Sequence, residues 1–375
     1  MAGLYIHLPF CLSKCPYCSF ISFPRLKHLQ RRYVEAIKKE LLDAAGTKEV
    51  RTIETVFLGG GTPTVLPVEL LCSVLDTCRD SFCLGNTAEI SIEANPGTVT
   101  KKDLIRLRQS GVNRISFGIQ SFIDNELVLL GRPYSSKSAS AVLGTAREAA
   151  FENISIDLMY GLPGQDHWAW EKSLEETSKV QPDHLSCYQL TIEDGTPFSK
   201  LMEDGDLPAA DEEEIEKMDE LTIKWARASG LEQYEISNFA RPGFECRHNI
   251  NYWLNGNYYA AGAAAVSCIG GRRQRRVGLP LQYCQMIERG SSPVIDEEKL
   301  DQHASFRESV VMGLRMIRGV CRQDFVARYG WDVQAYYGPL LRELQDQGLV
   351  ELDETHLRLT AQGRKLANRV MAELV

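Results

Sequence analysis

The sequence lacks both a long apolar run and a segment typical of protein targeting. Its most apolar stretch, residues 258–269, is rich in glycine and alanine and is shorter than the roughly 20 residues that a membrane-spanning helix requires. Residues 1–6 lead directly into an expected strand, with no basic region followed by a long apolar one. We therefore expect a cytoplasmic protein without stable membrane insertion.

An excess of positive charge is also absent. The chain has 42 Lys and Arg against 50 Asp and Glu, for a formal net charge of −8. Phosphate backbones bind to basic surfaces, so this balance argues against nucleic acid as a partner. A run of four arginines within residues 271–276 is the local exception, and we interpret it as a solvated loop.

The cysteines show no pattern typical of disulfides. They number 11, which is odd, and a chain of 375 residues can bury a core without covalent cross-links. In a reducing compartment they stay thiols. Eight are scattered, and we interpret most of these as small buried apolar residues. The other three, Cys11, Cys15 and Cys18, lie close together in one segment.

Strands and helices alternate through the first half of the chain. Short apolar runs predict strands, and segments with apolar residues at helical spacing lie between them. The expected strands are residues 4–8, 53–58, 88–93, 113–119, 154–159 and 184–190. Alternation of this kind predicts a parallel sheet with right-handed crossovers. Because six units are too few for a closed eight-unit barrel, we predict an α/β fold built on an open partial (β/α)6 barrel, with active groups at the carboxyl ends of its strands.

The alternation ends near residue 195, and we divide the chain into three domains. A barrel domain covers residues 1–195, an extension covers 196–300, and a C-terminal domain covers 301–375. In the extension we expect a loop-like segment at 191–208, a helix at 209–229 and an irregular region at 232–269. The C-terminal pattern of helices at 305–316 and 336–347, strands at 349–352 and 356–359 and a last helix from Thr360 predicts a winged-helix-like α+β domain. In an acidic chain we expect this domain to serve packing or interaction.

The three clustered cysteines can wrap a compact metal centre. Structural zinc sites usually take four ligands in two separated pairs, and no fourth cysteine follows nearby. A [4Fe–4S] cluster held by three thiolates keeps one iron open for a small chelating ligand. The segment also leaves the carboxyl end of the first expected strand, where the site of a barrel protein lies.

Further polar or flexible residues follow the other strands. Gly60, Gly61 and Thr62 come directly after the second strand, where glycines let a ligand approach the backbone. The expected mouth of the barrel also receives Glu93, Gln120, Arg132 and Asp157. An arginine suits a carboxylate, whereas acidic groups suit an amine or ribose hydroxyls.

Residues 248–253, HNINYW, combine a histidine with an amide and two aromatic rings. This group either belongs to a core cluster or supplies an axial heme ligand, His248, beside a flat stacking surface.

The segment YIHLPFCLSKCPYCSF, residues 5–20, resembles the cluster loop of radical SAM enzymes. It is similar in particular to the subgroup of oxygen-independent coproporphyrinogen oxidases and HemW-type heme chaperones. The resemblance implies that Cys11, Cys15 and Cys18 hold a [4Fe–4S] cluster whose open iron binds S-adenosylmethionine, and that reductive cleavage gives methionine and a 5′-deoxyadenosyl radical. It also implies a reductant protein such as a flavodoxin or ferredoxin. Contacts to S-adenosylmethionine are implied at Tyr5, Tyr17, Gly60, Gly61, Thr62, Glu93, Gln120, Arg132 and Asp157.

Two features of the resemblance favour the chaperones over the oxidases. The segment at His248 matches the HNxxYW motif of the HemW-type proteins and implies heme binding. Phe20 stands where the oxidases carry a further cysteine. Two residues depart from the family pattern, since Tyr134 and Val266 stand where a histidine is usual. We expect both departures to lie near the substrate or heme.

Three functions are therefore compatible with the sequence. The first is a heme chaperone that binds the cluster, S-adenosylmethionine and heme, and transfers heme to client proteins. The second is a radical SAM enzyme that acts on a porphyrin or another small molecule by oxidative decarboxylation or methyl transfer. The third is a non-catalytic zinc or interaction protein.

Overall fold

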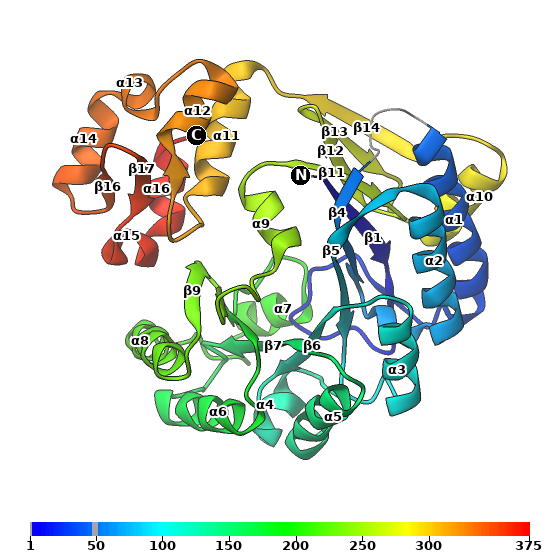
Figure 1. The fold of residues 1–375 in the computed structure, drawn as a ribbon. Coiled ribbons are helices and arrows are strands. Elements are labelled where there is room, and N and C mark those ends of the chain that lie inside the picture. Colours follow the sequence, from blue (N-terminus) through cyan, green and yellow to red (C-terminus); the bar gives the residue numbers. More distant parts are fainter. Residues whose placement is uncertain (1, 47–51) are drawn as a thin grey trace.

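The computed structural model describes residues 2–46 and 52–375 (Figure 1). Its main element is a twelve-stranded open sheet with six neighbouring parallel strands at the centre. These are β1 (Ala2–Leu8), β4 (Thr52–Gly60), β5 (Cys83–Ala94), β6 (Arg114–Gln120), β7 (Asn153–Tyr160) and β8 (His184–Gln189). The six expected strands and the open partial barrel are thereby confirmed.

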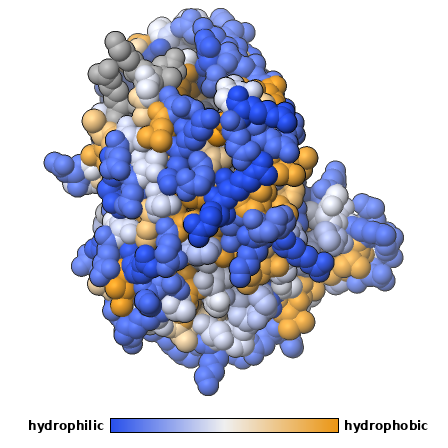
Figure 2. Space-filling model, turned by 90° about the vertical axis from the view of Figure 1, so that its right-hand side faces the viewer, coloured by the Kyte–Doolittle hydropathy of each residue, from blue (hydrophilic) through white to orange (hydrophobic). Residues whose placement is uncertain are grey.

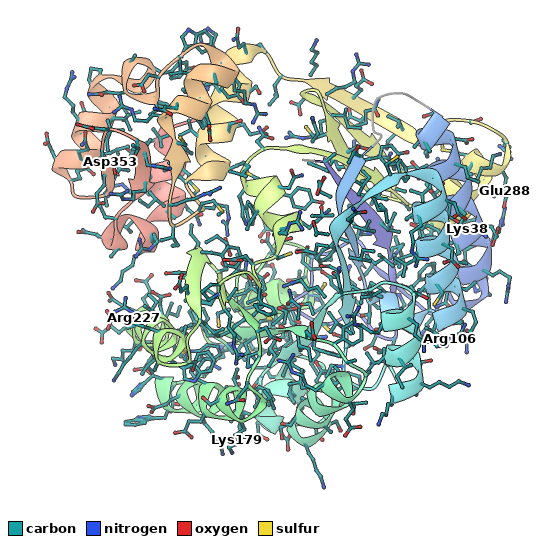
Figure 3. All side chains as sticks on the ribbon, viewed as in Figure 1. Lys38, Arg106, Lys179, Arg227, Glu288 and Asp353 are labelled. Atoms are coloured by element: carbon teal, nitrogen blue, oxygen red, sulfur yellow. The ribbon has the colours of Figure 1, made fainter. Side chains whose placement is uncertain are left out.

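The helices of the barrel cover one face of the sheet. They are α1 (Gln30–Gly46), α2 (Val68–Ser81), α3 (Lys101–Gln109), α4 (Asp124–Leu129), α5 (Ser136–Glu148) and α6 (His167–Val180). Leu4, Ile6 and Leu8 of β1 belong to the core beneath these helices, so the alternate residues Tyr5 and His7 face the barrel interior. Figure 2 shows that the outer face on the side of α1 and α2 is largely hydrophilic, and Lys38, Arg106 and Lys179 lie on the outer side of their helices (Figure 3).

Residues 196–300 extend the sheet at both edges. One edge gains β10 (Asn238–Ala240) and β9 (Glu232–Glu235) next to β8. The other gains β11 (Asn257–Ala261), which is parallel to β1, followed by β12 (Val266–Ile269), β13 (Arg272–Arg276) and β14 (Val294–Lys299). The region expected to be irregular therefore contains four of these strands, because pairing with the barrel stabilises runs too short to stand out in the sequence. Its helices are α7 (Pro197–Glu203), which lies in the segment expected to be a loop, α8 (Glu212–Ala228), α9 (Arg247–Trp253) and α10 (Pro280–Glu288).

The arginine run is not a solvated loop. It forms β13, where Arg272, Arg273 and Arg275 pair across the strands with acidic residues of β14. Arg276 is buried and forms an ion pair with Glu40 of α1. The interpretation as a loop was wrong because the acidic partners lie 21 or more residues away in the sequence, where charge patterning along the chain does not show them.

The C-terminal residues form a separate cluster of helices around a three-stranded sheet with its own apolar core. The elements are α11 (Gln302–Gly313), β15 (Val320–Cys321), α12 (Arg322–Tyr329), α13 (Val333–Tyr337), α14 (Pro339–Asp346), β16 (Val350–Leu352), β17 (His356–Leu359), α15 (Ala361–Lys365) and α16 (Ala367–Glu373). The hairpin of β16 and β17 confirms the two expected strands. The helix expected at 336–347 is divided at Gly338, which has a positive φ and precedes Pro339. No helix within the described residues is long and apolar enough to cross a membrane.

Candidate cluster and cofactor site

A cavity of about 360 Å³ opens at the carboxyl-terminal edge of the parallel strands. All of the expected site residues line it except Tyr5 and His248. The lining includes Cys11, Cys15, Tyr17, Cys18, Gly60, Gly61, Thr62, Glu93, Gln120, Arg132 and Asp157. They come together because the carboxyl ends of parallel strands share one edge of a sheet.

The three cysteines lie in the loop that follows β1. The short strands β2 (Phe10–Cys11) and β3 (Phe23–Pro24) pair with each other and hold the two ends of this loop together. Inside it, the backbone N–H of Cys18 donates to the carbonyl of Cys15 at 3.2 Å. All three side chains are free thiols of intermediate exposure, and burial raises the pKa of Cys18.

The three thiols of the loop do not converge on one point. Within the described residues, no group of three or more His, Cys, Asp or Glu side chains is placed to hold a metal ion. Thiolates that hold a four-iron cluster each bind a different iron, so they need not converge on one point. The donor set of three thiols at the rim of a cavity therefore fits such a cluster.

Two glycines of the motif after β4 are required by the packing of this loop. A Cβ at Gly61 would lie 2.6 Å from the carbonyl oxygen of Phe10 and 3.0 Å from the Sγ of Cys11. Gly60 has a φ of 115°, and a Cβ there would lie 2.5 Å from the ring of His7. A larger residue at Gly61 would displace the cysteine loop from the sheet, and one at Gly60 would collide with His7 of β1.

Arg132 brings a positive charge to the cavity without a negative partner. One of its terminal nitrogens donates to the Tyr17 hydroxyl at 2.5 Å and the other to Asn95 Oδ1 at 3.5 Å. Its Nε is shielded from solvent and has no hydrogen-bond partner, and no carboxylate among the described residues forms an ion pair with it. A shielded guanidinium with a free donor is suited to a carboxylate ligand, which it binds through two parallel hydrogen bonds.

Glu93 and Asp157 supply the opposite charge. Glu93 accepts a hydrogen bond from the backbone N–H of Gly60 at 3.1 Å, and Asp157 accepts one from the hydroxyl of Ser116 at 2.9 Å. Burial, together with the charge of Asp157, raises the pKa of Glu93 to about 7. Burial likewise raises the pKa of Asp157. Two enclosed carboxylates that repel each other are stabilised by a cationic ligand.

This arrangement makes Glu93 a source of instability in the cofactor-free protein. In the unfolded chain the carboxyl loses its proton near pH 4.5, but in the folded chain only near pH 7, so the folding stability falls as the pH rises through this interval. At about 1.4 kcal/mol per pKa unit, the loss reaches about 3 kcal/mol above pH 7. We expect Glu93→Gln to raise the urea midpoint of the cofactor-free protein at pH 8 and to leave it nearly unchanged at pH 5.

Glu152→Gln is the matched control, because Glu152 is exposed and outside the cavity. Equal urea midpoints for Glu93→Gln and the unsubstituted protein at pH 8 would show that ionised Glu93 does not destabilise the fold.

Asn95 and Tyr134 also line the cavity; the sequence did not identify Asn95 as a site residue, whereas it led us to expect Tyr134 near the substrate or heme. Asn95 donates to the Thr62 hydroxyl at 2.9 Å and accepts from Arg132, so it links the glycine motif to the guanidinium. Its position two residues beyond Glu93 at the end of β5 was the available signal, since alternate strand residues share a face. Tyr134 lines the cavity and donates its hydroxyl proton to the carbonyl of Gly118 at 2.6 Å.

His248 lies away from the cavity, inside the barrel. Its side chain is fully buried, and its ring packs against Phe57 with 5.2 Å between ring centres. Nδ1 is 2.8 Å from the Thr55 hydroxyl and Nε2 is 2.9 Å from the Tyr252 hydroxyl, so both ring nitrogens have partners. Burial and the charge of Arg114 lower the pKa of His248 to about 3. The ring is therefore neutral and enclosed.

Helix α9, which carries His248, is fastened to the barrel by a carboxylate. Glu89 of β5 accepts hydrogen bonds from the backbone N–H groups of Arg247 at 2.8 Å and His248 at 3.2 Å. Tyr5 lies between the cavity and His248. Its hydroxyl is 2.9 Å from His7 Nδ1, and its ring centre is 6.4 Å from that of His248. Val266 belongs to β12 and does not line the cavity.

An open parallel barrel with a three-cysteine loop at the carboxyl edge of its first strand defines a radical SAM protein. Comparison with family models agrees, because residues 5–177 match the Radical SAM superfamily and residues 300–366 match the HemN C-terminal domain.

Full-length relatives narrow the class. The chain is 36% identical over 371 residues to the heme chaperone HemW of Bacillus subtilis, with 99% of this chain and 98% of the relative covered. It is 32% identical to the heme chaperone HemW of Escherichia coli, with 98% of this chain and 97% of the relative covered. Its fold also matches the solved structure of the coproporphyrinogen III oxidase HemN of E. coli with a TM-score of 0.87 and 26% identity, covering 100% of this chain and 89% of that one. The chain belongs to the HemW heme chaperone family.

Proposed function

We propose that this protein is a heme chaperone that holds a [4Fe–4S] cluster and S-adenosylmethionine in the cavity, binds heme and passes it to client proteins. The relatives that match over nearly their whole length and carry the name heme chaperone support the chaperone role. One observation carries the cofactor part of the proposal: a single cavity joins three free thiols to a guanidinium without an anionic partner.

Each cavity residue has a role that follows from its chemistry. Cys11, Cys15 and Cys18 hold the cluster, which when bound supplies the electron for reductive cleavage of S-adenosylmethionine. Arg132, held by Tyr17, binds the carboxylate of the ligand. The charge of Glu93 attracts the amino group of the ligand beside the backbone of Gly60 and Gly61. Thr62 holds this glycine motif in place through its hydrogen bond with Asn95. Gln120 and Asp157 are left to bind the ribose hydroxyls. Tyr5 does not line the cavity; its hydroxyl contacts His7, whose ring lies against Gly60.

His248 is the proposed heme ligand within the barrel. Its enclosure requires a change of conformation before it can bind iron, because both nitrogens are hydrogen-bonded and the side chain is fully buried. Release of α9 from Glu89 would separate His248 Nδ1 from Thr55 of β4, but Nε2 would still face Tyr252, which lies on the same helix, so that hydrogen bond must also break.

This conformational requirement leads to a two-variant prediction. His248→Ala is expected to weaken the Soret band in a heme titration, because the axial ligand is lost. Tyr252→Phe removes the partner of Nε2 and is expected to raise heme affinity about fivefold, as a hydrogen bond worth about 1 kcal/mol no longer has to break.

Circular dichroism of each variant provides the control for folding. A heme affinity that changes in neither variant, with the folded spectrum retained, would rule out His248 as the ligand.

The proposed partners are heme-acceptor proteins and a reductant protein of the flavodoxin or ferredoxin type. The loop that carries the cysteines exposes apolar side chains beside the cavity, since Leu12 is 61% and Phe20 68% exposed. Such residues suit contact with a partner protein.

A further inference from the structure

The histidines of this chain differ in how their ring nitrogens are satisfied. All seven lie in the described part of the chain. His7, His184 and His248 are buried, and hydroxyl or carbonyl groups bind both of their nitrogens. Among the four at the surface, His167 alone pairs with a carboxylate. The remaining surface histidines are His28, His303 and His356.

His167 lies where the first turns of two neighbouring helices meet. Helices α6 and α8 lie side by side in Figure 1 and run in the same direction, because His167 contacts Glu214 at their first turns and Ser178 contacts Trp225 near their last turns. Glu214, in the first turn of α8, accepts hydrogen bonds from His167 Nδ1 at 2.7 Å and from its backbone N–H at 2.8 Å. The other carboxylate oxygen accepts from Lys217 at 2.7 Å.

These contacts determine which ring nitrogen of His167 is available. The hydrogen bonds from Lys217 and His167 lower the pKa of Glu214 to about 2, so the carboxylate is ionised and only accepts hydrogen bonds. Nδ1 must then carry the proton, and in the neutral ring the lone pair is on Nε2. Within residues 2–46 and 52–375, Nε2 has no hydrogen-bond partner.

A histidine oriented by a carboxylate in this way is typical of iron and zinc ligands, because the second hydrogen bond orients the ring and raises its basicity. A bare metal ion needs further donors, and the described residues offer no such group. Heme needs only one ligand from the protein, because the porphyrin supplies four nitrogens. Trp168, 67% exposed and 4.6 Å from His167 between ring centres, adds an apolar surface for a flat ligand.

We propose that His167, oriented by Glu214, binds heme iron through Nε2 at the surface of the protein, with Trp168 in contact with the porphyrin. This site is separate from His248 and requires no opening of the barrel, since the His167 side chain is 26% exposed. The inference rests on the proposed heme-chaperone function. It assigns the first encounter with heme to the exposed ends of α6 and α8.

The test is a heme titration of the full-length, cluster-containing protein, followed by the Soret band and by the electron paramagnetic resonance signal of ferric heme. His167→Ala is expected to weaken heme binding at the surface site roughly 10- to 100-fold and, when combined with His248→Ala, to remove the histidine-ligated signal. Glu214→Gln keeps the ring but removes the ionised acceptor, so we expect weaker binding with the histidine signal retained. His303→Ala is the matched control at another exposed histidine and should titrate like the unsubstituted protein.

Three outcomes would overturn the inference. The first is a folded His167→Ala protein that titrates like the unsubstituted one. The second is an equal loss in His303→Ala, which would indicate non-specific surface binding. The third is a loss confined to His248→Ala, which would leave the proposed function intact. If the unsubstituted protein shows no saturable heme binding, the proposed function itself fails.

Discussion

Cys15→Ala is expected to leave the protein with almost no iron after anaerobic reconstitution, where the unsubstituted chain should bind about four irons and four sulfides. Two thiolates from one short loop cannot hold three irons in place, and no fourth cysteine lies among the cavity residues. The result is measured as iron and sulfide per chain, together with the loss of the brown absorbance of the cluster.

Cys83→Ala is the matched control, because Cys83 is an exposed free thiol at the start of β5, outside the cavity. It should retain the full iron content. Full iron in Cys15→Ala would contradict the three-thiolate site, and tight zinc without iron in the unsubstituted chain would favour the interpretation as a zinc protein.

Arg132→Ala should lower the affinity of the cluster-containing protein for S-adenosylmethionine about 100-fold, because two hydrogen bonds between charged groups contribute about 3 kcal/mol. The loss of affinity should depend on the carboxylate of S-adenosylmethionine. Decarboxylated S-adenosylmethionine lacks that group, so its affinity should hardly differ between the unsubstituted and Arg132→Ala proteins. Anaerobic calorimetry measures both ligands.

Arg132→Lys separates charge from geometry. The lysine keeps a positive charge but cannot form the fork of donors that Arg132 directs toward Tyr17 and a ligand, so an intermediate affinity is expected. Equal losses for both ligands in Arg132→Ala would mean that the residue supports the cavity without binding the carboxylate.

The centre of the fold and most of the cavity could be predicted because both depend on local signals. The apolar runs of the six parallel strands are visible in the sequence, and parallel strands direct their carboxyl ends to one edge. The cavity lining at Glu93 and Gln120, which lie at the ends of β5 and β6, follows from that rule alone, whereas Asp157 lies within β7. Asn95 could have been found in the same way, two residues beyond Glu93.

The outer strands and the environment of His248 could not be predicted, because their partners are remote in the chain. The buried Arg276 forms an ion pair with Glu40, which precedes it by 236 residues. The buried His248 forms a hydrogen bond with Thr55, which is 193 residues away. A motif such as HNxxYW shows which residues are present but does not show whether they are accessible. Only the fold reveals that the imidazole of His248 is enclosed and that of His167 is partly exposed.

The position of β1 within the sheet has a consequence for the order of events during synthesis. β1 leads directly into the cysteine loop, and it pairs on one side with β4 and on the other with β11, Asn257–Ala261. A ribosome therefore releases the three thiols long before it releases the strand that completes their support. Until residue 261 has emerged, one edge of β1 has no backbone partner, so a stable cluster belongs to the last third of translation or later.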